Sequence, residues 1–271
     1  MKKNIPVIAT CCVLLLGVCV ILYPVISAIL AKMTQTVTIS NYQRAVQNLS
    51  NQEIEAMKED ARKYNETLYK TVLSDPFSQK KELDANYVKL LNIGEVMGYI
   101  DIPKINVYLP IYHGSSEEIL QKGVGHLQNT SLPIGGKSTH AVLTGHRGLP
   151  TATLFTDLDQ LVQGDLFYIH ILNGELVYRV DQIKVVEPED TSDLVIQQGE
   201  DYVTLVTCTP YGINTQRLLV RGTRVENESV QRRAQPELKL VNEVAVVPAG
   251  LLVVIALPVV LLIRRKRAVR K

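Results

Sequence analysis

The sequence predicts a mainly β fold, a closed barrel of seven to eight strands with short helices, flanked by two membrane-spanning helices. From residue 94 to 226, short runs rich in Val, Ile, Tyr and Thr alternate with Gly, Pro and Asn turns, a pattern typical of barrels. Towards each end, an uncharged stretch, 5–31 or 244–263, is long enough to cross a bilayer. Nearly half of the residues, 46%, are apolar, so the chain can bury a substantial core.

The predicted strands share β-branched and aromatic residues and are bounded by turn-forming residues. They are Val96–Ile102, Val107–Ile111, Thr139–Thr144, Leu166–Leu172, Glu175–Val186, Tyr202–Cys208 and Gln216–Val225. Helical turns are expected between strands at Glu117–Gln121 and Leu154–Leu161. Residues 94–226 are therefore assigned to one catalytic or binding domain.

Both apolar stretches are expected to remain as transmembrane helices. The first is longer than a signal-peptide core, and cleavage after Ala31 would place bulky Ile29 where a small residue is preferred. Basic flanks stay cytoplasmic, and they occur both at residues 1–4 and in the tail 264–271. We therefore expect a two-pass cell-membrane protein in contact with membrane lipid, with both termini cytoplasmic and the middle on the extracellular face. Residues 1–33 are expected to hold a cytoplasmic flank and the first transmembrane helix, 244–263 the second transmembrane helix, and 264–271 a basic cytoplasmic tail.

The charge distribution argues against nucleic acid as a partner. All 27 acidic residues lie between the two basic flanks, together with 21 of the 29 basic residues, which gives this region a formal charge of −6. Nucleic-acid recognition usually needs a basic face.

A helical segment is predicted to precede the barrel, over residues 34–93. Apolar residues recur there every three to five positions from Asn41 to Lys70, as on amphipathic helices. The following loop contains Asp75, Pro76 and Phe77, and proline cannot continue a helix. A short helix is expected at Ala85–Leu91, and polar residues 227–243 form a linker.

Cys208 is the only cysteine outside the first apolar stretch. It therefore cannot form an internal disulfide there, and it is a buried residue, an intermolecular linker or a reactive thiol. It ends a predicted strand just before Pro210, and strand ends that lead into loops often present reactive side chains. A cysteine nucleophile acts as a thiolate and needs a neighbouring histidine or cation.

Among the five histidines, His146 has the most suggestive place, in a Gly-containing turn at the end of a predicted strand. Arg217 begins the strand after Cys208, and antiparallel pairing would bring it near the thiol, although Arg221 on the same face is an equal candidate by spacing. No HExxH, CxxC, glycine-rich phosphate loop or GxSxG motif occurs, and the histidine spacings form no compact ligand pattern. No metal and no cofactor is therefore expected.

Several motifs together resemble the sortase family, and specifically its pilus-assembling class C. They include the TLxTC pattern at Thr204–Cys208, the Thr144-Gly145-His146 segment, and Arg217 nine residues after the cysteine. The matching segments cover most of residues 94–225. Two further features support class C: the second apolar stretch, and an Asp-Pro-Phe loop at residues 75–77 that resembles the lid of pilin sortases.

The resemblance implies a cysteine transpeptidase with Cys208, His146 and Arg217 as catalytic residues. Cys208 would cleave an LPxTG-like sorting signal on secreted pilin subunits, and a lysine amine of another subunit would resolve the thioester. Asp75 of the lid would meet Arg217, and Phe77 would cover Cys208. An ordinary turn is the alternative interpretation of the tripeptide, because Asp-Pro commonly opens turns, but its location before the barrel favours the lid.

Three other functions are alternatives. One is a sortase that attaches surface proteins to peptidoglycan, which differs in the amine that resolves the thioester. Another is a non-catalytic, membrane-anchored scaffold in which Cys208 is incidental. A thiol oxidoreductase is disfavoured because no second cysteine lies outside the apolar stretch.

Overall fold

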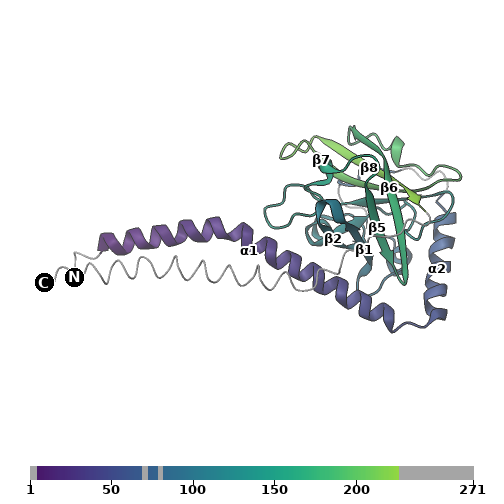
Figure 1. The fold of residues 1–271 in the computed structure, drawn as a ribbon, viewed down its shortest axis with the longest axis horizontal. Coiled ribbons are helices and arrows are strands. Elements are labelled where there is room, and N and C mark those ends of the chain that lie inside the picture. The colour runs from purple at the N-terminus through teal and green to yellow at the C-terminus, as the bar shows by residue number, and fades with distance from the viewer. Residues whose placement is uncertain (1–4, 69–72, 79–81, 226–271) are drawn as a thin grey trace. The chain divides into compact units, whose positions relative to one another are not determined.

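A computed structural model describes residues 5–68, 73–78 and 82–225 of the chain. Its main compact unit, Thr34–Val230, contains an N-terminal helical part and a closed barrel of eight strands (Figure 1). The strands follow one another around the barrel in the order β1-β2-β3-β4-β7-β8-β6-β5. Their bounds are β1 Val96–Ile102, β2 Val107–His113, β3 Val124–His126, β4 Thr139–Thr144, β5 Leu166–Ile171, β6 Gly174–Val186, β7 Asp201–Thr209 and β8 Gln216–Val225.

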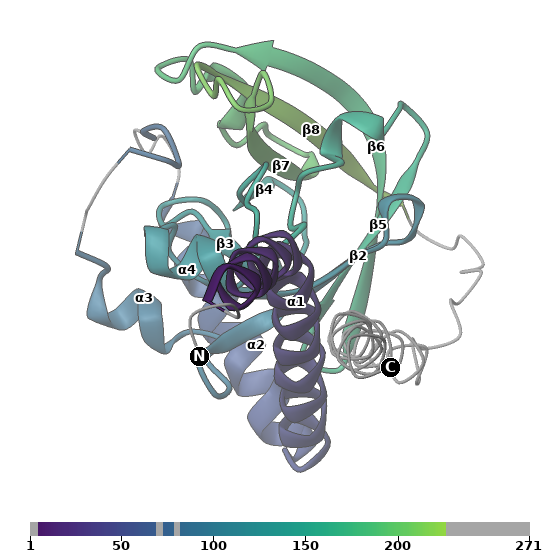
Figure 2. The same cartoon turned by 90° about the vertical axis from the view of Figure 1, so that its left-hand side faces the viewer.

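The helices lie mostly before the barrel or between its first strands. They are α1 Ile5–Gln47, α2 Asn51–Glu66, α3 Ala85–Lys89 and α4 Glu117–Lys122, with 3-10 turns η2 Pro103–Ile105, η3 Leu158–Gln160 and η4 Ser192–Leu194. Helix α2 begins at a capping box, in which Ser50 and Glu53 satisfy each other's backbone N–H groups. Helix α4 lies beside β3 (Figure 2).

The mainly β barrel predicted from the sequence is confirmed, with two local differences. Strand β3 was missed because its three residues, Val124–His126, are too few to show a periodic pattern. The helical turn expected at Leu154–Leu161 is reduced to η3, Leu158–Gln160. Leu154 has a φ of 42°, which is incompatible with a right-handed helix at that position.

One helix within the described residues, over Val13–Gln47 of α1, is long and apolar enough to cross a membrane. This agrees with the first predicted transmembrane helix in position and composition. The predicted linker 227–243, second transmembrane helix 244–263 and basic tail 264–271 lie outside the described residues.

Two of the strand pairings in the barrel are parallel. Strand β3 runs parallel to β2, and β4 runs parallel to β7, whereas the other neighbouring strands are antiparallel. All six residues of β4 are buried, as expected of a strand covered on both faces. The apolar core includes Ile100, Ile111, Leu143, Phe167, Leu205 and Val220, whose side chains are fully buried.

The last turns of α1 are joined to the barrel by the hydroxyl of Tyr42. This buried hydroxyl donates a hydrogen bond to the carbonyl of Met97 on β1 (3.1 Å) and accepts one from the backbone N–H of Leu172 after β5 (2.7 Å). Both backbone groups would otherwise be buried without a partner, which costs free energy.

We therefore expect Tyr42→Phe to lower the free energy of unfolding by about 1–3 kcal/mol, because it leaves a buried N–H and a buried C=O unpaired. Urea unfolding of the full chain in detergent, followed by circular dichroism, measures the change. Tyr211→Phe is the control, because the Tyr211 side chain is 60% exposed. Equal unfolding midpoints for the two variants would contradict the proposed contribution of this hydroxyl.

Candidate active site

Cys208 and Arg217 face each other across neighbouring antiparallel strands. Cys208 is the penultimate residue of β7, and its register partner on β8 is Arg217. Arg221, which spacing alone made an equal candidate, is instead opposite Thr204 and forms a bidentate ion pair with Asp181. The structure thus brings Arg217, and not Arg221, next to the thiol.

The parallel pairing of β4 with β7 brings His146 to the same place. In this register Thr144 pairs with Val206, so continuing it by two residues sets His146 alongside Cys208. The pairing does continue past the end of β4: the N–H of Gly145 donates to the carbonyl of Val206 (3.1 Å), and the Thr207 hydroxyl donates to the carbonyl of Gly145 (2.8 Å). His146 and Cys208 therefore lie at the same end of this pair of strands.

The loop that carries Asp75 is fastened to Arg217. The Arg217 guanidinium donates two parallel hydrogen bonds to the Asp75 carboxylate, from Nε to Oδ1 and from Nη2 to Oδ2, each of 2.8 Å. The two side chains are only 11% and 12% exposed. Bidentate, charge-assisted pairs of this kind are among the stronger hydrogen-bonded contacts in proteins.

The ring of Phe77 lies near both of the other site residues. Its centroid is 5.9 Å from that of the His146 ring, and the Arg217 Cζ lies 5.0 Å from it. The ring also packs against a buried apolar cluster that includes Val142 and Val206. Phe77 therefore lies close to both the imidazole and the guanidinium, on the same loop as Asp75.

The surroundings of Cys208 in this closed arrangement disfavour its thiolate. Burial raises the pKa of the thiol most, the positive charge of Arg217 lowers it, and the negative charge of Asp75 raises it again. Because the thiolate is the nucleophilic form, burial and the Asp75 carboxylate both oppose the reactive form, whereas Arg217 favours it.

The surroundings of the other four histidines indicate structural roles. His126 and His140 are fully buried, and burial lowers the pKa of His126 to about 3 and that of His140 to about 4. His126 is hydrogen bonded to the hydroxyl of Tyr87 at 2.8 Å and His140 to that of Thr204 at 2.7 Å. Burial also lowers the pKa values of His113 and His170. Within the described ranges, no group of three His, Cys, Asp or Glu residues is arranged to hold a metal ion.

The structure adds contacts that the sequence did not predict. Glu117, the first residue of α4, lies 3.0 Å from Nε2 of His146. Ser115, just before α4, donates a hydrogen bond of 2.6 Å to the carbonyl of Pro76 in the lid loop. Arg147 contacts the Thr209 hydroxyl at 3.4 Å and also pairs with Asp159. Nothing in the spacing of Glu117 and Ser115 from the other residues signalled these contacts.

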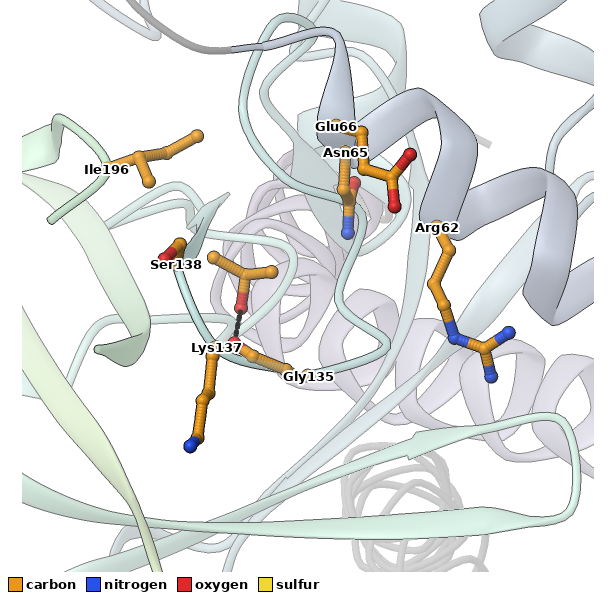
Figure 3. Close-up of a pocket in the computed structure, with 9 residues that line it drawn as sticks. Arg62, Asn65, Glu66, Gly135, Lys137, Ser138 and Ile196 are labelled. Atoms are coloured by element: carbon orange, nitrogen blue, oxygen red, sulfur yellow. Dashed lines mark hydrogen bonds between the residues drawn. The ribbon is translucent and has the colours of Figure 1, made fainter. Parts of the chain in front are cut away.

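A cavity of about 330 Å³ lies away from this edge, at the Thr139 end of β4 (Figure 3). It is lined by the C-terminal part of α2, including Arg62 and Asn65, and by residues 135–139. Strand β4 runs from Thr139 to Thr144, two residues before His146. The cavity and the candidate site therefore lie towards opposite ends of this strand.

Comparison with known protein families gives one match, the sortase domain, over residues 100–225. Among curated relatives, sortase D of Bacillus subtilis is 34% identical over 135 residues, which are 49% of this chain and 65% of that protein. Sortase A of Bacillus anthracis is 32% identical over 131 residues, 48% of this chain and 60% of that protein. The matched region thus spans slightly less than two thirds of these relatives.

Solved structures are matched over nearly their whole length. Sortase C-1 from Streptococcus pneumoniae is 50% identical, with a TM-score of 0.68 over 70% of this chain and 99% of that chain. A pilus-related sortase C of Group B Streptococcus is 48% identical, with a TM-score of 0.66 over 69% and 96%. Sortase C-1 from Actinomyces oris is 48% identical, with a TM-score of 0.61 over 64% and 99%. The chain therefore belongs to the sortase family of cysteine transpeptidases and is similar to its class C members.

Proposed function

We propose that this protein is a pilin-polymerising cysteine transpeptidase, with Cys208 as nucleophile, His146 as general acid and base, and Arg217 as the group that holds substrate. The main support is the register of the barrel, which aligns Cys208 with His146 on one side and Arg217 on the other. The similarity to a pilus-related sortase C, 48% identical, supports the choice of pilin as substrate.

The first half-reaction forms a thioester. The Cys208 sulfur attacks the threonine carbonyl of an LPxTG-like sorting signal, so that a C–S bond forms and the Thr–Gly C–N bond breaks. His146 gives a proton to the leaving glycine amine, as a general acid does. Arg217 donates hydrogen bonds to the substrate carbonyl oxygens or the developing oxyanion, where one fixed donor is worth about 3 kcal/mol.

The second half-reaction releases the enzyme. A lysine ε-amine from another pilin subunit attacks the thioester and loses a proton to His146, the reverse of the first transfer. An isopeptide bond forms, and Cys208 leaves as the thiolate. If both apolar stretches cross the membrane, enzyme and membrane-tethered pilin precursors share one surface, which raises their effective concentration.

In this scheme the Asp75–Phe77 loop is an inhibitory lid. Asp75 occupies the guanidinium of Arg217, and Phe77 lies close to both Arg217 and His146. A sorting signal therefore reaches the three residues only after the loop has moved away.

A thioester adduct is the direct test of the proposed function. We expect the full chain carrying Phe77→Ala, in detergent, to gain the mass of the acyl fragment when mixed with an LPxTG-type peptide. The adduct should be absent in the Phe77→Ala/Cys208→Ala variant and with a peptide of scrambled motif. Intact-protein mass spectrometry measures it. No adduct with any of several signal variants would favour a non-catalytic scaffold.

Release of the lid should change the reactivity of Cys208. Asp75→Asn removes a negative charge and the contact with Arg217, so both burial and repulsion of the thiolate decrease. The pKa of Cys208 should therefore fall, and the pH at which the thiol becomes reactive should move down. At pH 7 we expect iodoacetamide labelling to be roughly tenfold faster, which corresponds to about 1.4 kcal/mol of lid-closing free energy.

The control for this experiment is Asp60→Asn, because Asp60 lies on α2 in an exposed ion pair with Lys63. Its labelling rate should equal that of the unmodified chain at every pH. Equal rates for Asp75→Asn and Asp60→Asn would mean that the loop does not restrict the thiol.

The acceptor amine distinguishes pilin assembly from wall anchoring. With the thioester formed, we expect a pilin-derived peptide with an internal lysine to give the cross-linked product faster than an equal concentration of a peptidoglycan cross-bridge peptide. The two products differ in mass, so one chromatographic run measures both. Preference for the cross-bridge amine would assign the protein to wall anchoring and leave the acyl-transfer mechanism intact.

A further inference from the structure

His146 has a carboxylate partner that lies outside the three residues of the proposed mechanism. Nε2 of His146 is 3.0 Å from Oε2 of Glu117 at the start of α4. The imidazole side chain is 17% exposed, whereas that of Glu117 is 65% exposed. One of the two ring nitrogens is thus engaged by α4, and Nδ1 is the other nitrogen able to exchange a proton.

The Glu117 carboxylate is held by a second contact within its own helix. Its Oε1 accepts a hydrogen bond from the side-chain amide of Gln121, one helical turn later, at 3.0 Å. Helix α4 is in turn fixed by Leu120, which is 1% exposed. At the end of α4 the backbone approaches closely, because a Cβ on Gly123 would lie 2.7 Å from the carbonyl oxygen of Pro110. Both carboxylate oxygens therefore have defined partners on an anchored helix.

The charge of Glu117 is favoured in this position. The hydrogen bond from Gln121 lowers the pKa of the Glu117 carboxyl most, partial burial opposes this, and His146 lowers it further. An exposed ion pair contributes only about 0–1 kcal/mol to folding. The effect of this contact is therefore expected on the orientation of the ring rather than on the stability of the barrel.

We propose that Glu117 is a positioning residue for His146, an inference that rests on the proposed transpeptidase function. Its carboxylate accepts a hydrogen bond from Nε2–H and so leaves Nδ1 to give a proton to the leaving amine and to take one from the incoming amine. Glu117 itself stays deprotonated throughout. The arrangement follows the general logic of nucleophile, base and orienting group seen in cysteine and serine acyl-transfer enzymes.

The residues just before α4 also contact the lid, and this affects the design of the test. Ser115, two residues before Glu117, donates its hydroxyl hydrogen bond to the carbonyl of Pro76. A substitution at Glu117 could therefore alter lid closure as well as His146. Activity is best compared in the Phe77→Ala background, in which the lid ring is missing from every protein under comparison.

The test compares Glu117→Gln with Glu118→Gln in the full chain in detergent. Glu118 is the next residue of α4, is 79% exposed and pairs with Lys122, so its loss changes the net charge equally without touching His146. Steady-state cleavage of an LPxTG-type peptide is measured from pH 5 to 10. Thermal unfolding of both variants should match that of the background protein.

For Glu117→Gln we expect kcat to fall by roughly tenfold with KM unchanged. A positioned acid–base group contributes about 100-fold or more to the rate, and loss of its orientation should remove a part of this. The other ionisable groups of the site, Cys208, Arg217, Asp75 and Arg147, are retained in both variants. Glu118→Gln should keep the kcat and pH profile of the background.

Glu117→Ala, which also removes the hydrogen-bond acceptor, should lower kcat at least as far as Glu117→Gln. Equal kcat values for Glu117→Gln and Glu118→Gln would overturn the inference, whether both are unchanged or both are lowered. The background protein reports separately on the proposed function. If it forms no thioester, the transpeptidase proposal itself fails, whatever the effect at Glu117.

Discussion

The parallel pairing of β4 with β7 is the constraint on which the site depends. Parallel strands end at the same edge of a sheet, and here the backbone hydrogen bonds continue past β4 through Gly145. A one-residue slip in this register would turn every side chain of one strand to the other face. The buried residues of both strands prevent such a slip, so core packing also holds His146 beside Cys208.

The sequence predicted most of the barrel because its strands are long enough to show composition and turn signals. Strand β3 failed this criterion with three residues. The positions of Cys208, His146 and Arg217 at strand ends were visible from spacing, but the choice of Arg217 over Arg221 was not. That choice depends on which residue pairs with Cys208 across β7 and β8, a property of the folded register.

The contacts of α4 were beyond the reach of sequence reasoning for a different reason. Glu117 is an exposed glutamate at the start of a six-residue helix, where charged residues are common and carry no functional signal by themselves. Its contact with His146 arises from the path of the chain after β2, which brings α4 beside β3 and the turn that contains His146. That path cannot be predicted from residue type and spacing alone.

In the proposed mechanism, Arg217 binds Asp75 of the lid and also the substrate, and this affects the apparent affinity for substrates. One guanidinium cannot donate the same two hydrogen bonds to Asp75 and to a peptide, so in the proposed mechanism the lid and the substrate compete for a single donor. The apparent affinity for a substrate is then its intrinsic affinity reduced by the fraction of molecules with an open lid. In that mechanism the closed lid raises the concentration at which every sorting signal binds by one common factor, and the preference among signals is left to contacts made after the lid has opened.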